Sequence, residues 1–207
     1  MNPEIDFQSS ALMFLDFQVD VCDEEGRMVN KAPEVLDPFK QARQNAASLL
    51  KVARRSRNSP YIIHVRHVYE PGYPELEGKN ISKMESYVRD SRAFLEGSRG
   101  AQIVDELLPL PGEKVIAKCS LSPYVTTDLT QWLTKRHINT VILAGVVTHY
   151  VILATAFASY DAGYSVFVVK DCCMAGTPET HNTALSILDP ISTLVTGAEI
   201  EALISCI

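Results

Sequence analysis

The sequence lacks the features that mark several large classes of proteins. It contains no run of basic residues, and its 19 Lys and Arg against 25 Asp and Glu give a net charge of −6 over 207 residues. The charge therefore does not indicate a nucleic acid or an anionic membrane as the partner. Charged residues make up only 21% of the chain and hydrophobic residues 46%, which excludes a disordered protein.

Cysteines are few and form no recognisable framework. There are five, an odd number, and none has the Cys-x-x-Cys spacing of a zinc motif. We interpret them as free thiols in a reducing compartment and expect a cytoplasmic protein. The first ten residues, MNPEIDFQSS, are acidic rather than basic, so we expect no targeting peptide.

One long stretch has no charged residue. From His137 to Tyr160 the sequence contains no Asp, Glu, Lys or Arg, as a membrane-spanning helix would. Polar residues such as Asn139 interrupt it, and Gly145 stands where a strand can turn into a helix. We interpret the stretch as a buried strand followed by a buried helix, and we expect no membrane span.

Apolar runs and helical patterns alternate along the whole chain. The apolar runs are not broken by polar residues at every second position, which is typical of parallel strands that are buried on both faces. We predict a single domain over residues 1–207, with a doubly wound three-layer α/β/α sandwich and a mostly parallel sheet of about six strands. Residues 68–100 are polar and rich in Gly and Pro, and we interpret them as a long surface excursion of functional importance. Strands are predicted at 11–15, 61–65, 114–117, 140–144, 165–169 and 192–195, and helices at 33–55, 103–108, 127–136, 148–162, 178–188 and 198–204.

Polar residues at the ends of predicted strands are the candidates for chemistry, because doubly wound folds bind ligands at the carboxyl ends of their strands. Asp16 and Lys118 each end such a strand, so an ion pair between them is geometrically available. Burial would raise the pKa of Asp16 and an ammonium group would lower it, and the sequence does not decide between them. The turn at 145–149 leads a strand into a helix whose first amide groups can hold an anion. The alternatives are a loop acid for Asp16, a solvent-exposed lysine for Lys118 and a helix N-cap for Thr148.

Three segments of the sequence form a recognisable combination: ALMFLDFQVD at 11–20, VIAKCSLSPY at 115–124 and VILAGVVTHYVILATAFASYDAGYSVFVVKDCC at 141–173. Together they resemble the isochorismatase-like hydrolases, which include isochorismatase, nicotinamidase and N-carbamoylsarcosine amidohydrolase. The usual catalytic groups of this family are an Asp, a Lys and a nucleophilic Cys. The resemblance implies that Asp16 and Lys118 are catalytic, whereas Val151 stands at the position of the cysteine.

Val151 decides which activity the resemblance implies. Valine cannot attack a carbonyl group, so an amidase that needs a thiolate is disfavoured. Isochorismatases also lack the cysteine, and they have a histidine where this chain has His149. Their vinyl-ether hydrolysis needs a general acid and water but no protein nucleophile.

The sequence therefore predicts a hydrolase of a small carboxylated molecule. The best-motivated reaction converts isochorismate to 2,3-dihydro-2,3-dihydroxybenzoate and pyruvate, with Asp16 as the general acid. Two alternatives stay open. One is an inactive family member that binds a ligand or a protein, and the other is an amide hydrolase with an unusual nucleophile such as Thr148 or a water molecule held by Asp16.

We expect no metal and no other cofactor. The nicotinamidase branch binds a metal through an Asp-x-His motif that this chain lacks. His64 and His67 lie three residues apart on a predicted strand, so their side chains point to opposite faces. No glycine-rich nucleotide fingerprint is present. The expected partners are a small-molecule substrate and further copies of this chain, because the family usually forms dimers or tetramers.

The resemblance also implies details of the substrate site. A cis peptide bond between Val146 and Val147 would turn the amide groups of Val147 and Val151 toward the substrate. The residues expected to contact the substrate are Gln18, His67, Tyr69, Glu70, Tyr124, Val147, Thr148, His149 and Val151, with Arg66 and Lys79 as further candidates.

Overall fold

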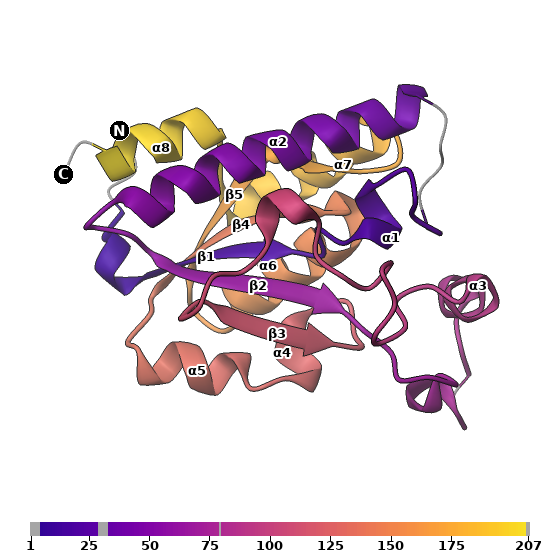
Figure 1. Ribbon diagram of the computed structural model, residues 1–207. Coiled ribbons are helices and arrows are strands. Elements are labelled where there is room, and N and C mark those ends of the chain that lie inside the picture. Colours follow the sequence, from indigo (N-terminus) through magenta and orange to yellow (C-terminus); the bar gives the residue numbers. More distant parts are fainter. Residues whose placement is uncertain (1–4, 29–32, 79, 206–207) are drawn as a thin grey trace.

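The computed structural model describes residues 5–28, 33–78 and 80–205. Its centre is a six-stranded sheet with the strand order β3-β2-β1-β4-β5-β6 (Figure 1). Every pairing within this sheet is parallel, so the predicted sheet is confirmed. The strands are β1 (Ser10–Leu15), β2 (Tyr61–His67), β3 (Lys114–Lys118), β4 (Thr140–Val146), β5 (Ser165–Met174) and β6 (Thr193–Val195).

Helices cover both faces of the sheet. The long helix α2 (Pro33–Arg55) and the last helix α8 (Gly197–Ser205) pack on one face. On the other face lie α5 (Leu129–Lys135), α6 (Leu153–Asp161) and α7 (Pro178–Leu188). The three-layer α/β/α sandwich is therefore confirmed. The remaining described helices are α1 (Val19–Cys22), α3 (Lys83–Ser91) and α4 (Pro123–Thr126). There are also 3-10 turns at Phe7–Ser9, Pro74–Leu76, Asp105–Leu107 and Asp189–Ile191.

The first strand shows why the apolar runs do not alternate. All six residues of β1 are buried. Leu12 and Phe14 belong to the core beneath α2, whereas Met13 and Leu15 belong to the core on the opposite face. Each fully buried side chain of this size stabilises the fold by about 1.5–3 kcal/mol relative to an exposed one. Packing on both faces of the sheet therefore fixes the register of β1.

The uncharged stretch folds as a strand and a helix, as predicted. It contains β4, a π-helical turn at Thr148–Ile152, and then α6. In the ranges that the structure describes, no helix is both long enough and apolar enough to cross a bilayer. The N-cap interpretation of Thr148 is wrong, because the capping position falls on Val147 and makes no side-chain hydrogen bond. Instead the Thr148 hydroxyl lies 2.8 Å from Nδ1 of His181 on α7.

The excursion at 68–100 has a small core of its own. Its buried residues include Tyr69, Tyr73, Val88 and Phe94. It also contains α3, which begins with a capping box in which Ser82 and Glu85 bond each other's backbone amides. The strands in Figure 1 point toward the side of the molecule where α1 and α3 lie. The excursion therefore stands beside the carboxyl ends of the strands.

Candidate active site

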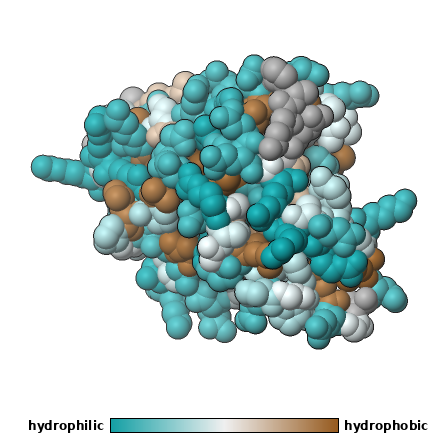
Figure 2. Space-filling view, turned by 45° about the vertical axis from the view of Figure 1, so that its right-hand side comes forward, coloured by the Kyte–Doolittle hydropathy of each residue, from teal (hydrophilic) through white to brown (hydrophobic). Residues whose placement is uncertain are grey.

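A cavity of about 390 Å³ opens at the carboxyl edge of the sheet. Asp16 follows β1, His67 ends β2, and the turn after β4 contributes Val147, His149 and Val151. Figure 2 brings this side of the molecule forward and shows hydrophobic residues in brown between hydrophilic residues in teal. The cavity lies where the strand-end rule predicts the site.

Asp16 and Lys118 form the predicted ion pair. The Lys118 ammonium donates to Oδ2 of Asp16 over 2.8 Å. Only 7% of Asp16 and 3% of Lys118 are exposed, so the pair is shielded from water. Asp16 has a φ of 56°, in the left-handed region that Asp tolerates better than most residues. Its backbone N–H still donates to Val65 on β2, which holds this turn against the sheet.

The buried environment decides the protonation of Asp16. Burial raises its pKa, while the charge and the hydrogen bond of Lys118 lower it; burial is the larger effect, so the pKa lies above the usual value. Oδ1 of Asp16 is buried and has no hydrogen-bond partner among the described residues. Because Oδ2 is bound to Lys118, Oδ1 is the atom that can carry a proton into the cavity.

His67 stands on the other side of the same ammonium. Its Nδ1 lies 3.3 Å from Nζ of Lys118, and Nε2 is buried without a partner among the described residues. Burial and the charge of Lys118 lower the pKa of His67 well below its usual value. The imidazole packs against the rings of Tyr69 and Phe94, at centroid distances of 4.9 and 5.2 Å.

Gln18 holds the end of β2 in place. Its side-chain amide donates to the carbonyl groups of His67 and Ala101, and its Oε1 accepts from the His67 N–H over 2.6 Å. The side chain is fully buried, and its hydrogen-bonding groups are occupied by backbone. Gln18 is expected from the sequence to contact the substrate, but the structure places it behind the cavity wall as a positioning residue.

Several other expected residues do line the cavity. These are Tyr69, Val147, His149 and Val151. The peptide bond between Val146 and Val147 is cis, the geometry that the resemblance implies. Val151 is 2% exposed and brings a hydrocarbon side chain to the cavity wall.

The remaining expected residues lie outside this lining. Glu70 is exposed, and the Tyr124 hydroxyl accepts a hydrogen bond from Ser159. Thr148 is completely buried against His181, and Arg66 forms an ion pair with Glu96. These side chains are absent from the described cavity wall. Lys79 lies outside the described residues.

In the described part of the chain, no cysteine lines the cavity. Cys22, Cys172 and Cys173 are buried. Burial raises the pKa of Cys22 and of Cys173 to about 12 and raises that of Cys172 further still, so these thiols stay protonated at neutral pH. Cys119 is half-buried against the cluster around Tyr69, and it is not among the described residues of the cavity wall.

Much of the cavity wall is apolar and was not predicted. It comes from the segment before α2, from α2 itself, from the excursion at 68–100 and from the loop between β3 and α4, so it depends on chain segments that meet only in the folded molecule. The residues of this wall have no regular spacing in the sequence that would predict it. The main contributors are Met28, Phe39, Met84, Val88, Phe94 and Leu121.

The described residues include no group of three or more His, Cys, Asp or Glu that could hold a metal ion. His64 and His67 have separate surroundings. His64 bonds Glu113 over 2.9 Å and stacks on Phe14, whereas His67 faces Lys118. The candidate site is therefore an acid–ammonium–imidazole cluster at the base of an apolar cavity.

The fold and the site define a three-layer α/β protein with a buried acid–ammonium pair at the carboxyl edge of a parallel sheet. Residues 10–199 match the Isochorismatase domain, and the chain belongs to this family of isochorismatase-like hydrolases. It is 29% identical over 169 residues to the uncharacterized isochorismatase family protein YddQ of Bacillus subtilis, which covers 82% of this chain and 79% of that protein.

Some relatives have a stated enzymatic activity. The chain is 27% identical over 179 residues to the maleamate amidohydrolase of Pseudomonas putida, which covers 86% of this chain and 78% of that enzyme. The crystal structure of an isochorismatase family protein from Desulfovibrio vulgaris matches with a TM-score of 0.78 at 24% identity, covering 95% and 98% of the two chains. This structural likeness shows the shared fold.

Proposed function

We propose that the protein hydrolyses a vinyl ether of the isochorismate type, with Asp16 as the general acid and without a protein nucleophile. The observation that carries this proposal is the Asp16 carboxyl group. It is buried, its pKa is raised, and one of its oxygen atoms has no partner among the described residues of the cavity. By the resemblance, an amidase of this family needs its thiol at the position of Val151, whose hydrocarbon side chain lines the cavity.

The reaction proceeds in three steps that use Asp16 and water. The Asp16 carboxyl group protonates the terminal carbon of the C=C–O unit, and the ether carbon becomes an oxocarbenium ion. Water adds to that carbon and gives a hemiketal. The hemiketal breaks its original C–O bond, releasing an alcohol and a ketone, and a proton returns to Asp16. With isochorismate the products are 2,3-dihydro-2,3-dihydroxybenzoate and pyruvate.

Lys118 stabilises the carboxylate that proton transfer leaves behind. Its ammonium group is already bonded to Oδ2 of Asp16, so no side chain has to move when the charge develops. The new carboxylate in turn stabilises the positive charge on the substrate. Tyr69, Val147 and His149 are the proposed contacts for the body of the substrate.

Amide hydrolysis is the second candidate because relatives of this chain include amidohydrolases. It requires a nucleophile at the base of the cavity. Thr148 is completely buried, bonds His181 and is not among the described residues of the cavity wall. The geometry therefore favours acid-catalysed addition of water.

Turnover by wild-type protein and an Asp16→Asn variant tests the proposal. The substrates are isochorismate and α-methoxystyrene, beside the amides maleamate and nicotinamide. We expect hydrolysis of a vinyl ether, with kcat lowered about a hundredfold or more in Asp16→Asn because the general acid is lost. Asp37→Asn, the same chemical change at an exposed position of α2, is the matched control and keeps wild-type activity. Val151→Ala keeps activity within about tenfold because no nucleophile is removed.

Three outcomes would contradict the proposal. Full activity in Asp16→Asn would exclude Asp16 as the acid. Turnover of an amide but of no vinyl ether would favour amide hydrolysis by another nucleophile. No turnover of any of these substrates would favour an inactive family member that binds a ligand or a protein.

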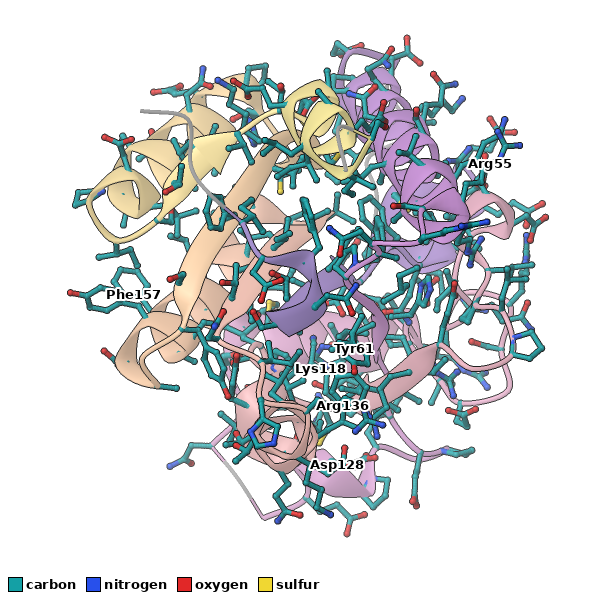
Figure 3. All side chains as sticks on the ribbon, turned by 90° about the vertical axis from the view of Figure 1, so that its left-hand side faces the viewer. Arg55, Tyr61, Lys118, Asp128, Arg136 and Phe157 are labelled. Atoms are coloured by element: carbon teal, nitrogen blue, oxygen red, sulfur yellow. The ribbon has the colours of Figure 1, made fainter. Side chains whose placement is uncertain are left out.

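The assembly and location are also proposals. Tyr150, Phe157 and Tyr160 are exposed aromatic residues on or next to α6, and Figure 3 shows Phe157 projecting outward from the body of the protein. We expect a homodimer or homotetramer that covers such side chains, which light scattering of the purified protein would measure. The four described cysteines are free thiols, which supports a reducing location such as the cytoplasm.

A further inference from the structure

We propose that the substrate of this site is an uncharged molecule with an apolar body and one oxygen atom that accepts a hydrogen bond from Nε2–H of His67. This inference rests on the proposed function, since the oxygen must lie beside the bond that Asp16 protonates. It keeps the proposed vinyl-ether hydrolysis and replaces the carboxylated substrate, isochorismate included, with an uncharged vinyl ether. His67 then becomes the residue that determines specificity.

The ammonium group of Lys118 fixes the tautomer of His67. An ammonium nitrogen has three hydrogen atoms and no lone pair, so it donates to His67 Nδ1, which lies 3.3 Å away. Burial and the charge of Lys118 lower the pKa of this imidazole, so the ring is neutral. A neutral ring whose Nδ1 accepts must carry its single proton on Nε2.

The Nε2–H donor has no acceptor in the described part of the protein. His67 is only 8% exposed, and it lines the cavity. Buried donors without a partner are rare in folded proteins because they lose their hydrogen bonds to water. An oxygen atom of a bound molecule would satisfy this donor, whereas an ammonium or another N–H group would not.

Asp16 supplies a second unpartnered atom next to this donor. Oδ1 of Asp16 is also buried without a described partner. Asp16 and His67 are anchored to the same Lys118 nitrogen, over 2.8 and 3.3 Å. The two free atoms can therefore act on one small functional group. Nε2–H binds the ether oxygen when the substrate binds and again when this oxygen leaves the hemiketal as the alcohol, and the carboxyl group of Asp16 delivers a proton to the terminal carbon.

The rest of the cavity favours an uncharged body. Its wall includes Met28, Met84, Val88 and Phe94, and no described residue of the wall is a Lys or an Arg. Burial lowers the pKa of His149, so that ring does not supply a cation at neutral pH. The Lys118 ammonium at the base of the cavity is already bonded to Asp16 and His67, so a carboxylate against the apolar wall would lose water without gaining a partner of opposite charge there.

Binding of three aromatic probes tests this inference without requiring turnover. Calorimetry with wild-type protein would use acetophenone, ethylbenzene and benzoate, which share a ring but differ in the acceptor oxygen and the charge. We expect acetophenone to bind about five- to tenfold more tightly than ethylbenzene, because only acetophenone can accept from Nε2–H. Benzoate should bind about tenfold or more weakly than acetophenone.

Two variants separate the contribution of the His67 hydrogen bond to binding from the contribution of the apolar wall. His67→Phe keeps an aromatic ring but has no donor, so it should remove the preference for acetophenone over ethylbenzene. Met84→Arg places a cation in the wall at a half-buried position of α3 and should raise the affinity for benzoate about tenfold. Tyr87→Arg, at an exposed position of the same helix outside the described wall, is the control and should leave all three affinities unchanged.

The inference fails if benzoate binds wild-type protein more tightly than acetophenone, if ethylbenzene binds as tightly as acetophenone, or if none of the probes binds. Because calorimetry reads binding alone, these outcomes are distinct from those of the turnover assay. Probe binding as expected without vinyl-ether hydrolysis would refute only the proposed reaction. Hydrolysis of isochorismate without acetophenone binding would refute only the uncharged substrate.

Discussion

At the scale of single residues, one ammonium group organises the site. Lys118 bonds Asp16 on one side and faces Nδ1 of His67 on the other. It therefore determines which oxygen of Asp16 and which nitrogen of His67 are left for a ligand. A lysine that never touches the reacting bond can control the chemistry through its two neighbours.

The pH dependence of the reaction follows from the raised pKa of Asp16. In the proposed mechanism the protonated carboxyl group is the active form, so kcat/KM should be highest at low pH and fall as pH rises through this pKa. Lys118→Met removes the charge that opposes the effect of burial, so the pKa should rise and the fall in kcat/KM should move to higher pH.

A pH–rate profile of both proteins with the same vinyl ether measures this shift. A profile in which kcat/KM instead rises with pH would mean that Asp16 works as a carboxylate. A Lys118→Met profile that moves to lower pH would contradict the stated influence of the ammonium group.

Sequence reasoning located the polar part of the site but not the direction of every side chain. Asp16 and Lys118 follow from the rule on strand ends, and their pairing is confirmed. Gln18 and Tyr124 belong to the same motifs, but their side chains bond protein groups instead of facing the cavity. A motif identifies neighbours along the chain, whereas side-chain direction depends on tertiary contacts. The sequence left open whether burial or Lys118 has the larger effect on the pKa of Asp16, and in the structure burial has the larger effect.

At the scale of elements, strands were easier to predict than short helices. The predicted strand at 61–65 and the predicted helix at 33–55 correspond closely to β2 and α2, because both have long apolar patterns. The predicted helix at 103–108 is only the 3-10 turn Asp105–Leu107. α3 was missed in the polar excursion, although the Ser-x-x-Glu spacing of its capping box was a usable signal.

Asp20 on α1 ties that excursion to the segment that follows β1. Its carboxylate accepts from the backbone N–H groups of Phe94, over 2.7 Å, and of Arg27. A side-chain carbon on Gly100 would lie 2.3 Å from this carboxylate, so only glycine leaves it room. These contacts hold the wall residue Phe94 against the cavity.

Asp20→Ala should loosen the cavity wall without removing the acid. The buried N–H of Phe94 loses its acceptor, which should lower the free energy of unfolding by about 1–3 kcal/mol. KM should rise more than kcat falls, because the wall binds substrate while Asp16 is unchanged. Urea unfolding and steady-state kinetics measure the two effects.

Asp90→Ala, at an exposed position of α3, is the matched control and should change neither quantity. If Asp20→Ala lowers kcat alone and leaves KM and stability unchanged, Asp20 has a direct chemical role instead.

At the scale of the whole molecule, a partly buried carboxylate joins three segments at the edge of the sheet. Glu113, just before β3, accepts from Arg54 near the end of α2 over 2.7 Å, and it bonds His64 on β2 over 2.9 Å. Leu110 donates its backbone N–H to the same carboxylate. These bonds, chiefly those of Arg54, lower the pKa of Glu113 to about 2. This cluster fastens the longest helix to the sheet.

The Glu113 cluster makes a pH-dependent contribution to stability. Since the pKa of Glu113 is lower in the folded protein, its contribution is complete above the usual value of 4.5 and is lost as pH falls toward about 2. Glu113→Gln should therefore unfold more easily than wild type at pH 6, and the difference should shrink as the pH approaches 2. Urea unfolding at a series of pH values measures this.

Glu179→Gln, an exposed glutamate on α7, is the control for the loss of a surface charge and should leave stability nearly unchanged. A difference between Glu113→Gln and wild type that stays constant from pH 6 to pH 2 would show that the charge of Glu113 does not stabilise the fold.

The acid and its ammonium partner come from β1 and β3, whereas the apolar wall comes mostly from α2, the segment before it, and the excursion at 68–100. In the proposed site, the proton donor and most of the apolar wall are thus encoded in different stretches of the chain. Substitutions in the excursion can change the wall while Asp16 and Lys118 keep their positions at the strand ends.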